Sequence, residues 1–108
     1  MNYSKINKEL IIITGAGQGI GRQIAKNLDS KYDLLLISKT LNCKKTAKEI
    51  KATSFKNKNR IVEYQKVNFE KKINLISTAK KIKFKRFKKI HLILCAGMVD
   101  PDKGSYKN

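Results

Sequence analysis

The 108-residue chain has little cysteine and no long hydrophobic run. Its two cysteines, Cys43 and Cys95, lie far apart and lack the spacing of metal ligands, which predicts free thiols in a reducing compartment. Its run Leu10–Ile13 is shorter than the core of a secretory signal and far shorter than a bilayer span. It contains no repeat or low-complexity segment. We therefore expect a cytoplasmic protein that forms one domain or part of one and has no membrane partner.

Acidic residues are also scarce. The chain has 25 Lys and Arg against 8 Asp and Glu, and its formal net charge is +17. Such an excess can mark a protein that binds nucleic acid or an anionic membrane. Here nearly all of it is lysine spread along the chain, whereas arginine, which pairs bidentately with phosphates and bases, occurs only at positions 22, 60 and 86. With abundant Asn and Ile, this pattern favours compositional drift over a basic binding patch, and we expect no nucleic-acid partner.

Apolar residues follow strand-like and helix-like patterns in alternation. Strand-like segments alternate with apolar recurrences of three or four residues, which predict helices, and the apolar runs at 10–14 and 33–38 are typical of buried strands, the first of them buried on both faces. The predicted strands are Leu10–Thr14, Asp33–Ser38, Ile61–Val67 and Ile90–Cys95; the predicted helices are Ile20–Leu28, a segment marked by Cys43, Ala47 and Ile50, and Phe69 to about Phe84. In the first helix, Ile20, Ile24 and Leu28 are expected to face the core. The order β-α-β-α-β-α-β predicts a doubly wound parallel α/β sheet with helices on both faces.

Four glycines lie between positions 15 and 21, directly after the first predicted strand. Glycine is entropically unfavourable where order is needed, so this density needs a reason. A glycine-rich turn between a strand and a helix lets the backbone approach a pyrophosphate, which then lies on the N–H groups at the helix start. The common G-x-G-x-x-G spacing is absent, because its last glycine would fall on Ile20 or Arg22. The spacing present is T-G-x-x-x-G-x-G, formed by Thr14, Gly15, Gly19 and Gly21.

This spacing resembles the cofactor loop of the short-chain dehydrogenase/reductase family. The resemblance implies a Rossmann-type sheet in the order 3-2-1-4, truncated after the fourth strand, with a nicotinamide dinucleotide as partner. It also implies that residues of the loop bind the cofactor: Thr14, Gly15, Gly17, Gln18, Gly19, Ile20 and Gly21. Among them, Gly17 is expected to leave room around the diphosphate.

The end of the second predicted strand bears on the choice of cofactor. It carries Ser38, Lys39 and Thr40. Family members that use NAD usually have an acidic residue at the position of Ser38, where a carboxylate accepts hydrogen bonds from the ribose hydroxyls. Position 38 is not acidic here, and the Lys39 ammonium would neutralise a 2′-phosphate. The resemblance therefore implies NADP in preference to NAD; the alternative is that Lys39 is one more solvated lysine.

The ends of the third and fourth strands extend the resemblance. Asn68 and Phe69 lie where the family usually has an Asp that contacts the adenine amino group, and Asn68 keeps a carbonyl acceptor without the charge. Cys95, Ala96 and Gly97 resemble the family's N-A-G motif, whose small residues let the chain pass close to the cofactor ribose. Cys95 replaces an Asn that ties neighbouring strands together, and we expect it to be a small packing residue rather than a reactive thiol.

Two further observations concern catalysis. His91, the only histidine, lies within an apolar strand and is expected to be structural. Hydride transfer in the family uses a Ser on the fifth strand and a Tyr and Lys in Y-x-x-x-K, where the lysine lowers the pKa of the tyrosine. None of the four tyrosines has a lysine four residues later.

The resemblance thus implies that residues 1–108 are the N-terminal part of a single NADP-binding Rossmann domain whose C-terminal catalytic half is absent. The full-length form would be a short-chain oxidoreductase acting on a small carbonyl or alcohol substrate, and family members of full length are often homo-oligomers. The alternative is a complete chain that binds nucleotides or polyanions without catalysis, helped by its positive charge.

Overall fold

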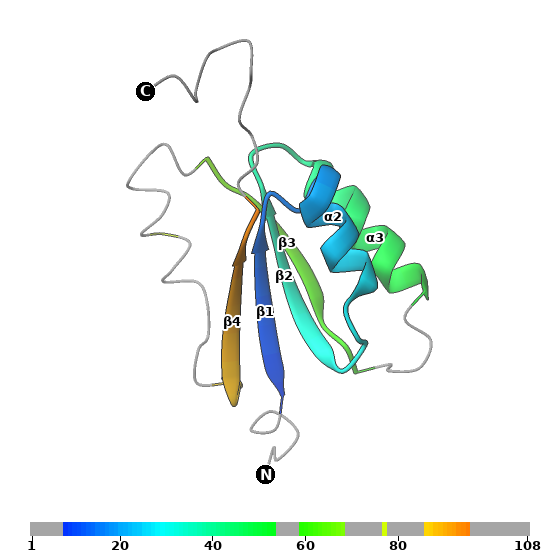
Figure 1. Cartoon of the computed structure of the whole chain (residues 1–108), viewed down its shortest axis with the longest axis vertical. Coiled ribbons are helices and arrows are strands. Elements are labelled where there is room, and N and C mark those ends of the chain that lie inside the picture. Colours follow the sequence, from blue (N-terminus) through cyan, green and yellow to red (C-terminus); the bar gives the residue numbers. More distant parts are fainter. Residues whose placement is uncertain (1–7, 54–58, 69–76, 78–85, 96–108) are drawn as a thin grey trace.

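The computed structural model describes residues 8–53, 59–68, 77 and 86–95. Within them the elements follow in the order β1 (Glu9–Thr14), α2 (Gly19–Asn27), β2 (Tyr32–Ser38), α3 (Asn42–Thr53), β3 (Val62–Lys66) and β4 (Lys89–Leu94). All the strands are parallel and form one sheet in the order β3-β2-β1-β4 (Figure 1). The predicted Rossmann-type α/β fold and its 3-2-1-4 strand order are confirmed.

The predicted elements differ from the observed ones mainly at their ends. Each strand agrees with its prediction to within one residue at either end. The helix α3 continues to Thr53, beyond Ile50, the last residue of the predicted pattern, because its final turn is solvent-exposed and adds no residue to the buried face. The helix predicted from Phe69 to about Phe84, and with it the second helix-covered face, lies outside the described residues apart from Ser77.

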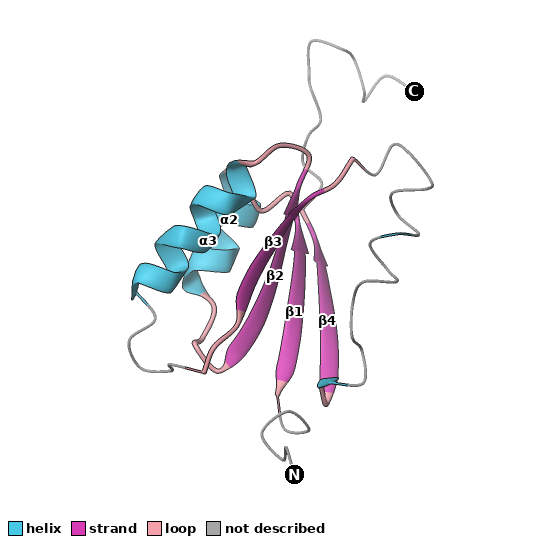
Figure 2. Cartoon of the chain, turned by 180° about the vertical axis from the view of Figure 1, so that it is seen from behind, coloured by secondary structure: helices cyan, strands magenta, loops and turns pink. Residues whose placement is uncertain are grey.

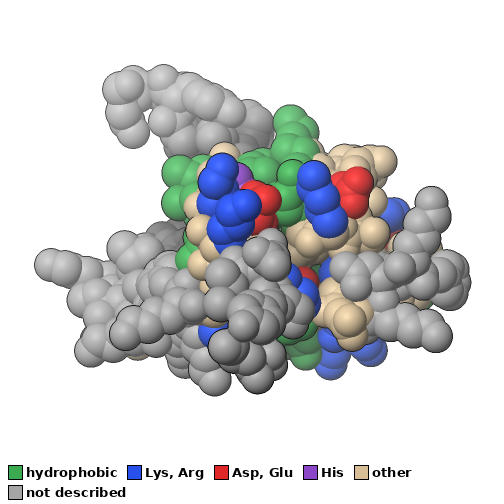
Figure 3. Space-filling model, turned by 90° about the horizontal axis from the view of Figure 1, so that it is seen from below, with side chains coloured by type: hydrophobic (Ala, Val, Ile, Leu, Met, Phe, Trp, Pro, Cys, Tyr) green, Lys and Arg blue, Asp and Glu red, His purple; other side chains and the backbone are tan. Residues whose placement is uncertain are grey.

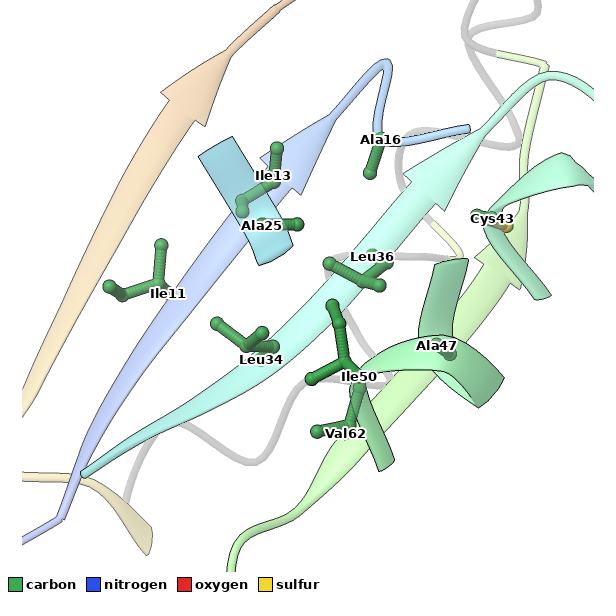
Figure 4. Close-up of a cluster of buried hydrophobic side chains, with 10 residues drawn as sticks. All are labelled: Ile11, Ile13, Ala16, Ala25, Leu34, Leu36, Cys43, Ala47, Ile50 and Val62. Atoms are coloured by element: carbon green, nitrogen blue, oxygen red, sulfur yellow. The ribbon is translucent and has the colours of Figure 1, made fainter. Parts of the chain in front are cut away.

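Both described helices pack on the same face of the sheet (Figures 1 and 2). Alternate residues of a strand point to opposite faces, so every second strand residue meets the helices. The resulting core joins the strands to α2 and α3 (Figure 4) and consists of Ile11, Ile13, Ala16, Ala25, Leu34, Leu36, Cys43, Ala47, Ile50 and Val62. The other face carries a smaller cluster of Leu10, Ile12, Leu35 and Ile37. Burial on both faces explains why β1 and β2 are almost uninterrupted apolar runs.

The helix α2 buries a different residue at its start from the one predicted. Ile20 is expected to face the core, but it is 75% exposed. The buried residues of α2 are Gly21 and Ala25, and Ile24 and Leu28 are partly buried against the larger cluster. The apolar pattern fails here because the first turn of α2 meets the rest of the protein through a glycine, which has no side chain to reveal the contact.

The edge strand β4 is apolar in sequence but largely exposed. Leu92 is 59% exposed and Leu94 is 69% exposed. β4 pairs with β1, and among the described residues no strand pairs with its other edge. The apolar run therefore predicts the strand correctly but gives no information on how deeply it is buried.

His91 links β4 to β1 near the end of the sheet where the strands begin. Its Nε2 atom lies 2.7 Å from Oε1 of Glu9, and its ring meets the Tyr32 ring edge-on, with the ring centroids 6.2 Å apart. In the space-filling view from below, the histidine lies beside acidic and basic side chains (Figure 3). The hydrogen bond from His91 is the main cause that lowers the pKa of Glu9 below its ordinary value. This cross-strand contact supports the structural role expected for His91.

The substitution Glu9→Gln should reduce the acid dependence of stability. Because the pKa of Glu9 is lowered in the folded state, its carboxylate stabilises the fold above the unfolded-state pKa of about 4.3, and this contribution disappears as the pH falls through the folded-state pKa. In urea unfolding, the wild type should exceed Glu9→Gln in stability at neutral pH, and the difference should shrink on acidification. Glu63→Gln, at an exposed carboxyl of β3, is the control and should show no such convergence. If the stability difference between the wild type and Glu9→Gln did not change with pH, a lowered pKa of Glu9 in the folded state would be contradicted.

Candidate functional site

The predicted site residues gather at one edge of the sheet. All the strands are parallel, so their carboxyl ends meet at this edge, which lies at the arrowheads in Figure 1. The glycine segment follows β1, residues 38–40 close β2, Asn68 comes shortly after β3 and Cys95 comes directly after β4. Phe69, Ala96 and Gly97 lie outside the described residues. In open α/β sheets this edge, near the point where the strand order reverses, is where ligands bind.

The loop between β1 and α2 uses its glycines in different ways. Gly15 and Gly19 have φ angles of 67° and 60°, in the left-handed region that side chains disfavour. At Gly21 the reason is space. A Cβ there would lie 2.3 Å from the carbonyl oxygen of Gly15 and 3.1 Å from the Cβ of Cys95. Two glycines therefore turn the chain, and Gly21 lets the start of α2 lie against the loop.

Gly17 has a packing role that the glycine spacing alone does not indicate. A Cβ at this position would lie 2.7 Å from the Cβ of Asn42 and 3.2 Å from both the backbone nitrogen of Cys43 and the Cβ of Ser38. The side of Gly17 that a Cβ would occupy is therefore filled by the end of β2 and the start of α3. At Gly19, by contrast, a Cβ would meet no atom within 4 Å. The open space lies at the start of α2.

The two helices differ in how their first N–H groups are satisfied. At α3, the Asn42 N–H donates to Thr40 Oγ1 over 3.2 Å and the Cys43 N–H donates to Ser38 Oγ over 3.1 Å. At α2, the side chain of the N-cap residue Gln18 makes no capping hydrogen bond, and the first turn contains no acidic residue. The N–H groups at a helix start carry partial positive charge and need acceptors. Of these two helix starts, that of α2 is the one suited to an anion.

Ser38 is buried and its hydroxyl is engaged within the protein. It donates to the Thr40 carbonyl and accepts the hydrogen bond from the Cys43 N–H. If Ser38 also contacted the cofactor ribose, its hydroxyl would have to keep or give up its hydrogen bonds to Thr40 and Cys43. Lys39 and Thr40, in contrast, are exposed. Lys39 is therefore the exposed charged side chain at the end of β2.

The ends of β1 and β4 are joined through the backbone. The Cys95 N–H donates to the Thr14 carbonyl over 3.2 Å, although the Asn expected at position 95 is missing. Cys95 is a free thiol that packs, partly buried, against the larger core cluster, in keeping with a packing residue. The hydroxyl of Thr14 is buried and has no hydrogen-bond partner among the described residues. It is therefore an unused donor and acceptor at the edge where the site residues meet.

The helix α3 contributes to this site in a way that the motif does not indicate. The Thr46 hydroxyl donates to the Ala16 carbonyl over 3.0 Å, and the Ala16 N–H donates to the Ile37 carbonyl over 3.0 Å. In the sequence, Thr46 is an ordinary polar residue within an amphipathic helix. Only the packing of α3 beside the loop distinguishes it.

The described residues offer neither a metal site nor a membrane-spanning helix. No group of three or more His, Cys, Asp or Glu side chains there is placed to hold a metal ion. Within the same residues no helix has the length and apolar character needed to cross a bilayer.

A family model described as short chain dehydrogenase matches residues 9–107. A solved structure of a betaketoacyl-[ACP] reductase (FabG) from Bacteroides thetaiotaomicron is 28% identical, covers 94% of this chain with a TM-score of 0.71, and matches over 46% of its own length. A second solved structure is a putative D-mannonate oxidoreductase from Haemophilus influenza with bound NAD, which is 24% identical. It covers 79% of this chain with a TM-score of 0.60 and matches over 30% of its own length. This second likeness concerns the fold alone. The chain spans less than half of either protein. No curated protein matches it.

Substitutions at Gly19 and Gly21 should separate the two uses of glycine. At Gly19 the backbone conformation is the obstacle, so Gly19→Ala should destabilise the fold by about 1–2 kcal/mol and Gly19→Asn by less, because Asn tolerates the left-handed region. At Gly21 space is the obstacle, so Gly21→Ala should destabilise by about 1–3 kcal/mol or more and Gly21→Asn should be worse than Ala. Urea unfolding measures all four. A Gly21→Ala variant as stable as the wild type would contradict the observed close approach.

Proposed function

The chain belongs to the short-chain dehydrogenase family, and from this premise we propose that it is the cofactor-binding part of an NADP-dependent oxidoreductase acting on a small carbonyl or alcohol. The loop between β1 and α2 carries the proposal. It has the T-G-x-x-x-G-x-G spacing, positive φ angles at Gly15 and Gly19, and a helix start without a side-chain cap. An anionic diphosphate complements these N–H groups.

The residues at the carboxyl edge suit a dinucleotide. The diphosphate would be held by backbone N–H groups at the start of α2, where no side chain fills the space beside Gly19. The proposed diphosphate position beside Gly19 is adjoined by the other predicted residues of the loop, Thr14, Gly15, Gln18 and Ile20. We further propose, by resemblance to the family, that Asn68 and Phe69 border the adenine and that Cys95, Ala96 and Gly97 border a ribose. The bound cofactor would supply or accept the hydride.

The preference for NADP rests on the end of β2. No carboxylate is present at positions 38–40, so the usual acceptor for a free ribose 2′-hydroxyl is missing. The Ser38 hydroxyl is engaged within the turn, and Lys39 is an exposed cation. An ammonium at this position favours an added 2′-phosphate. The putative D-mannonate oxidoreductase has bound NAD, whereas positions 38 and 39 of this chain favour NADP.

The residues of this chain contribute binding rather than proton transfer. Tyr32 and Tyr64 are followed four residues later by Leu36 and Asn68, and Tyr32 lies beside His91, near the end of the sheet opposite the proposed site. A positioned general acid or base contributes about 10²–10⁴-fold to a typical enzyme rate. We therefore expect residues 1–108 alone to give no hydride transfer above background, as measured by NADPH absorbance with a panel of carbonyl compounds.

The substitution Lys39→Asp should reverse or erase the preference for NADP. The wild type should bind NADPH more tightly than NADH, by about ten-fold or more, because a charged hydrogen-bond partner to the 2′-phosphate is worth at least about 1.4 kcal/mol. Fluorescence titration with both cofactors gives the ratio of their dissociation constants. Lys48→Asp makes the same change of charge at an exposed position of α3 and is the control.

In the control variant the ratio should stay at the wild-type value. Tighter binding of NADH by the wild type would refute the argument from positions 38 and 39. If Lys39→Asp and Lys48→Asp weakened NADPH equally, binding would depend on total charge, as expected for a polyanion-binding module.

A further inference from the structure

The middle of the glycine loop is held by β2 and α3. Ala16 is fully buried, and both of its backbone polar groups have partners from outside the loop. Its N–H donates to the Ile37 carbonyl of β2, and its carbonyl accepts a hydrogen bond from the hydroxyl of Thr46, each over 3.0 Å. Thr46 is itself fully buried. A buried backbone group that loses its partner is strongly unfavourable, so these contacts fix the position of Ala16.

The loop needs such external support because of its composition. Glycine adopts a wide range of backbone conformations, so the glycines flanking Ala16 do not themselves select one. Gly17 packs closely against the start of α3, since a Cβ there would lie 2.7 Å from the Cβ of Asn42 and 3.2 Å from the backbone nitrogen of Cys43. The fixed path of the backbone toward the start of α2 therefore depends on residues that lie outside the T-G-x-x-x-G-x-G motif.

Thr46 is oriented toward the loop rather than satisfied within its own helix. Threonine hydroxyls inside helices commonly bond the carbonyl four residues earlier. Here that carbonyl, of Asn42, lies 3.4 Å from Thr46 Oγ1, farther than the Ala16 carbonyl. Thr53 provides the contrast within α3, because among the described residues its hydroxyl bonds only to the carbonyls of Glu49 and Ile50 of the same helix.

We propose that Thr46 is a positioning residue for the cofactor: it does not touch the dinucleotide but holds the Ala16 carbonyl, and through it the backbone N–H groups that would receive the diphosphate. This inference rests on the proposed function. The same helix is capped by Ser38 and Thr40, on either side of Lys39. α3 thus ties the diphosphate loop and the 2′-phosphate end of the site into one preorganised unit, which lowers the entropic penalty of binding.

The test compares Thr46→Val, Thr46→Ser and the control Thr53→Val in the 108-residue chain. Val keeps the shape of Thr46 and removes the hydroxyl; Ser keeps the hydroxyl. Thr46→Val should weaken NADPH binding about five- to ten-fold, since a buried carbonyl is left unpaired, whereas Thr46→Ser should stay within about two-fold of the wild type. Thr53→Val should bind as the wild type does. Without cofactor, amide hydrogen exchange of residues 15–19 should be faster than in the wild type for Thr46→Val and unchanged for Thr46→Ser and Thr53→Val.

Several outcomes would overturn the inference. The inference fails if Thr46→Val binds NADPH as tightly as the wild type does, whether or not amide hydrogen exchange in the loop becomes faster. Equal losses in Thr46→Ser and Thr46→Val would overturn it too, because the hydroxyl would not be the cause. If Thr46→Val does not fold, Thr46→Cys, with its weaker thiol donor, replaces it with the same expected loss. A wild-type chain that binds neither NADPH nor NADH would overturn the proposed function as well, which distinguishes the two failures.

Discussion

The close approach of α2 to the loop that precedes it is the constraint on which the site depends. The absent Cβ of Gly21 would lie 2.3 Å from the Gly15 carbonyl oxygen, so the first turn of α2 can reach its position only with glycine there. The same contact brings α2 against Cys95, directly after β4. It also explains why Ile20, one residue earlier, is exposed while Gly21 is buried. Two residues before Gly21, at Gly19, the backbone has open space beside it, because a Cβ there would meet no atom within 4 Å.

A second support comes from α3, which lies beside the same loop. Its Asn42 Cβ fills the space at Gly17, and its Thr46 hydroxyl holds the Ala16 carbonyl. At its own start, α3 uses hydroxyls from the end of β2 as caps. These contacts leave the two helix starts with opposite characters: that of α3 is closed by Ser38 and Thr40, and that of α2 carries no side-chain cap. The difference gives a physical reason for placing an anion at α2.

Much of this arrangement could be predicted from the sequence, but not its packing. The apolar runs gave the strands to within one residue, whereas the 3-2-1-4 order came from the resemblance carried by Thr14 and the glycines. The exposure of Ile20 and the packing of Gly17 were missed, because hydrophobic patterns count side chains and both features depend on backbone contacts. The use of the Ser38 hydroxyl as a cap was missed for a similar reason. Its partners, Thr40 and Cys43, are close in sequence, yet the bond depends on how the turn is folded.

Binding of a dinucleotide at the α2 start is the central claim, and an NMR titration of the ¹⁵N-labelled chain with NADP⁺ tests it most directly. The amide resonances of Gly15, Gly19 and Ile20, together with those around Lys39, should show saturable shifts. The amides of Lys48 and Lys51, which lie on the exposed side of α3, should change little. Shifts confined to the exposed lysines of α3, with the loop amides unchanged, would contradict it and would indicate binding through charge alone.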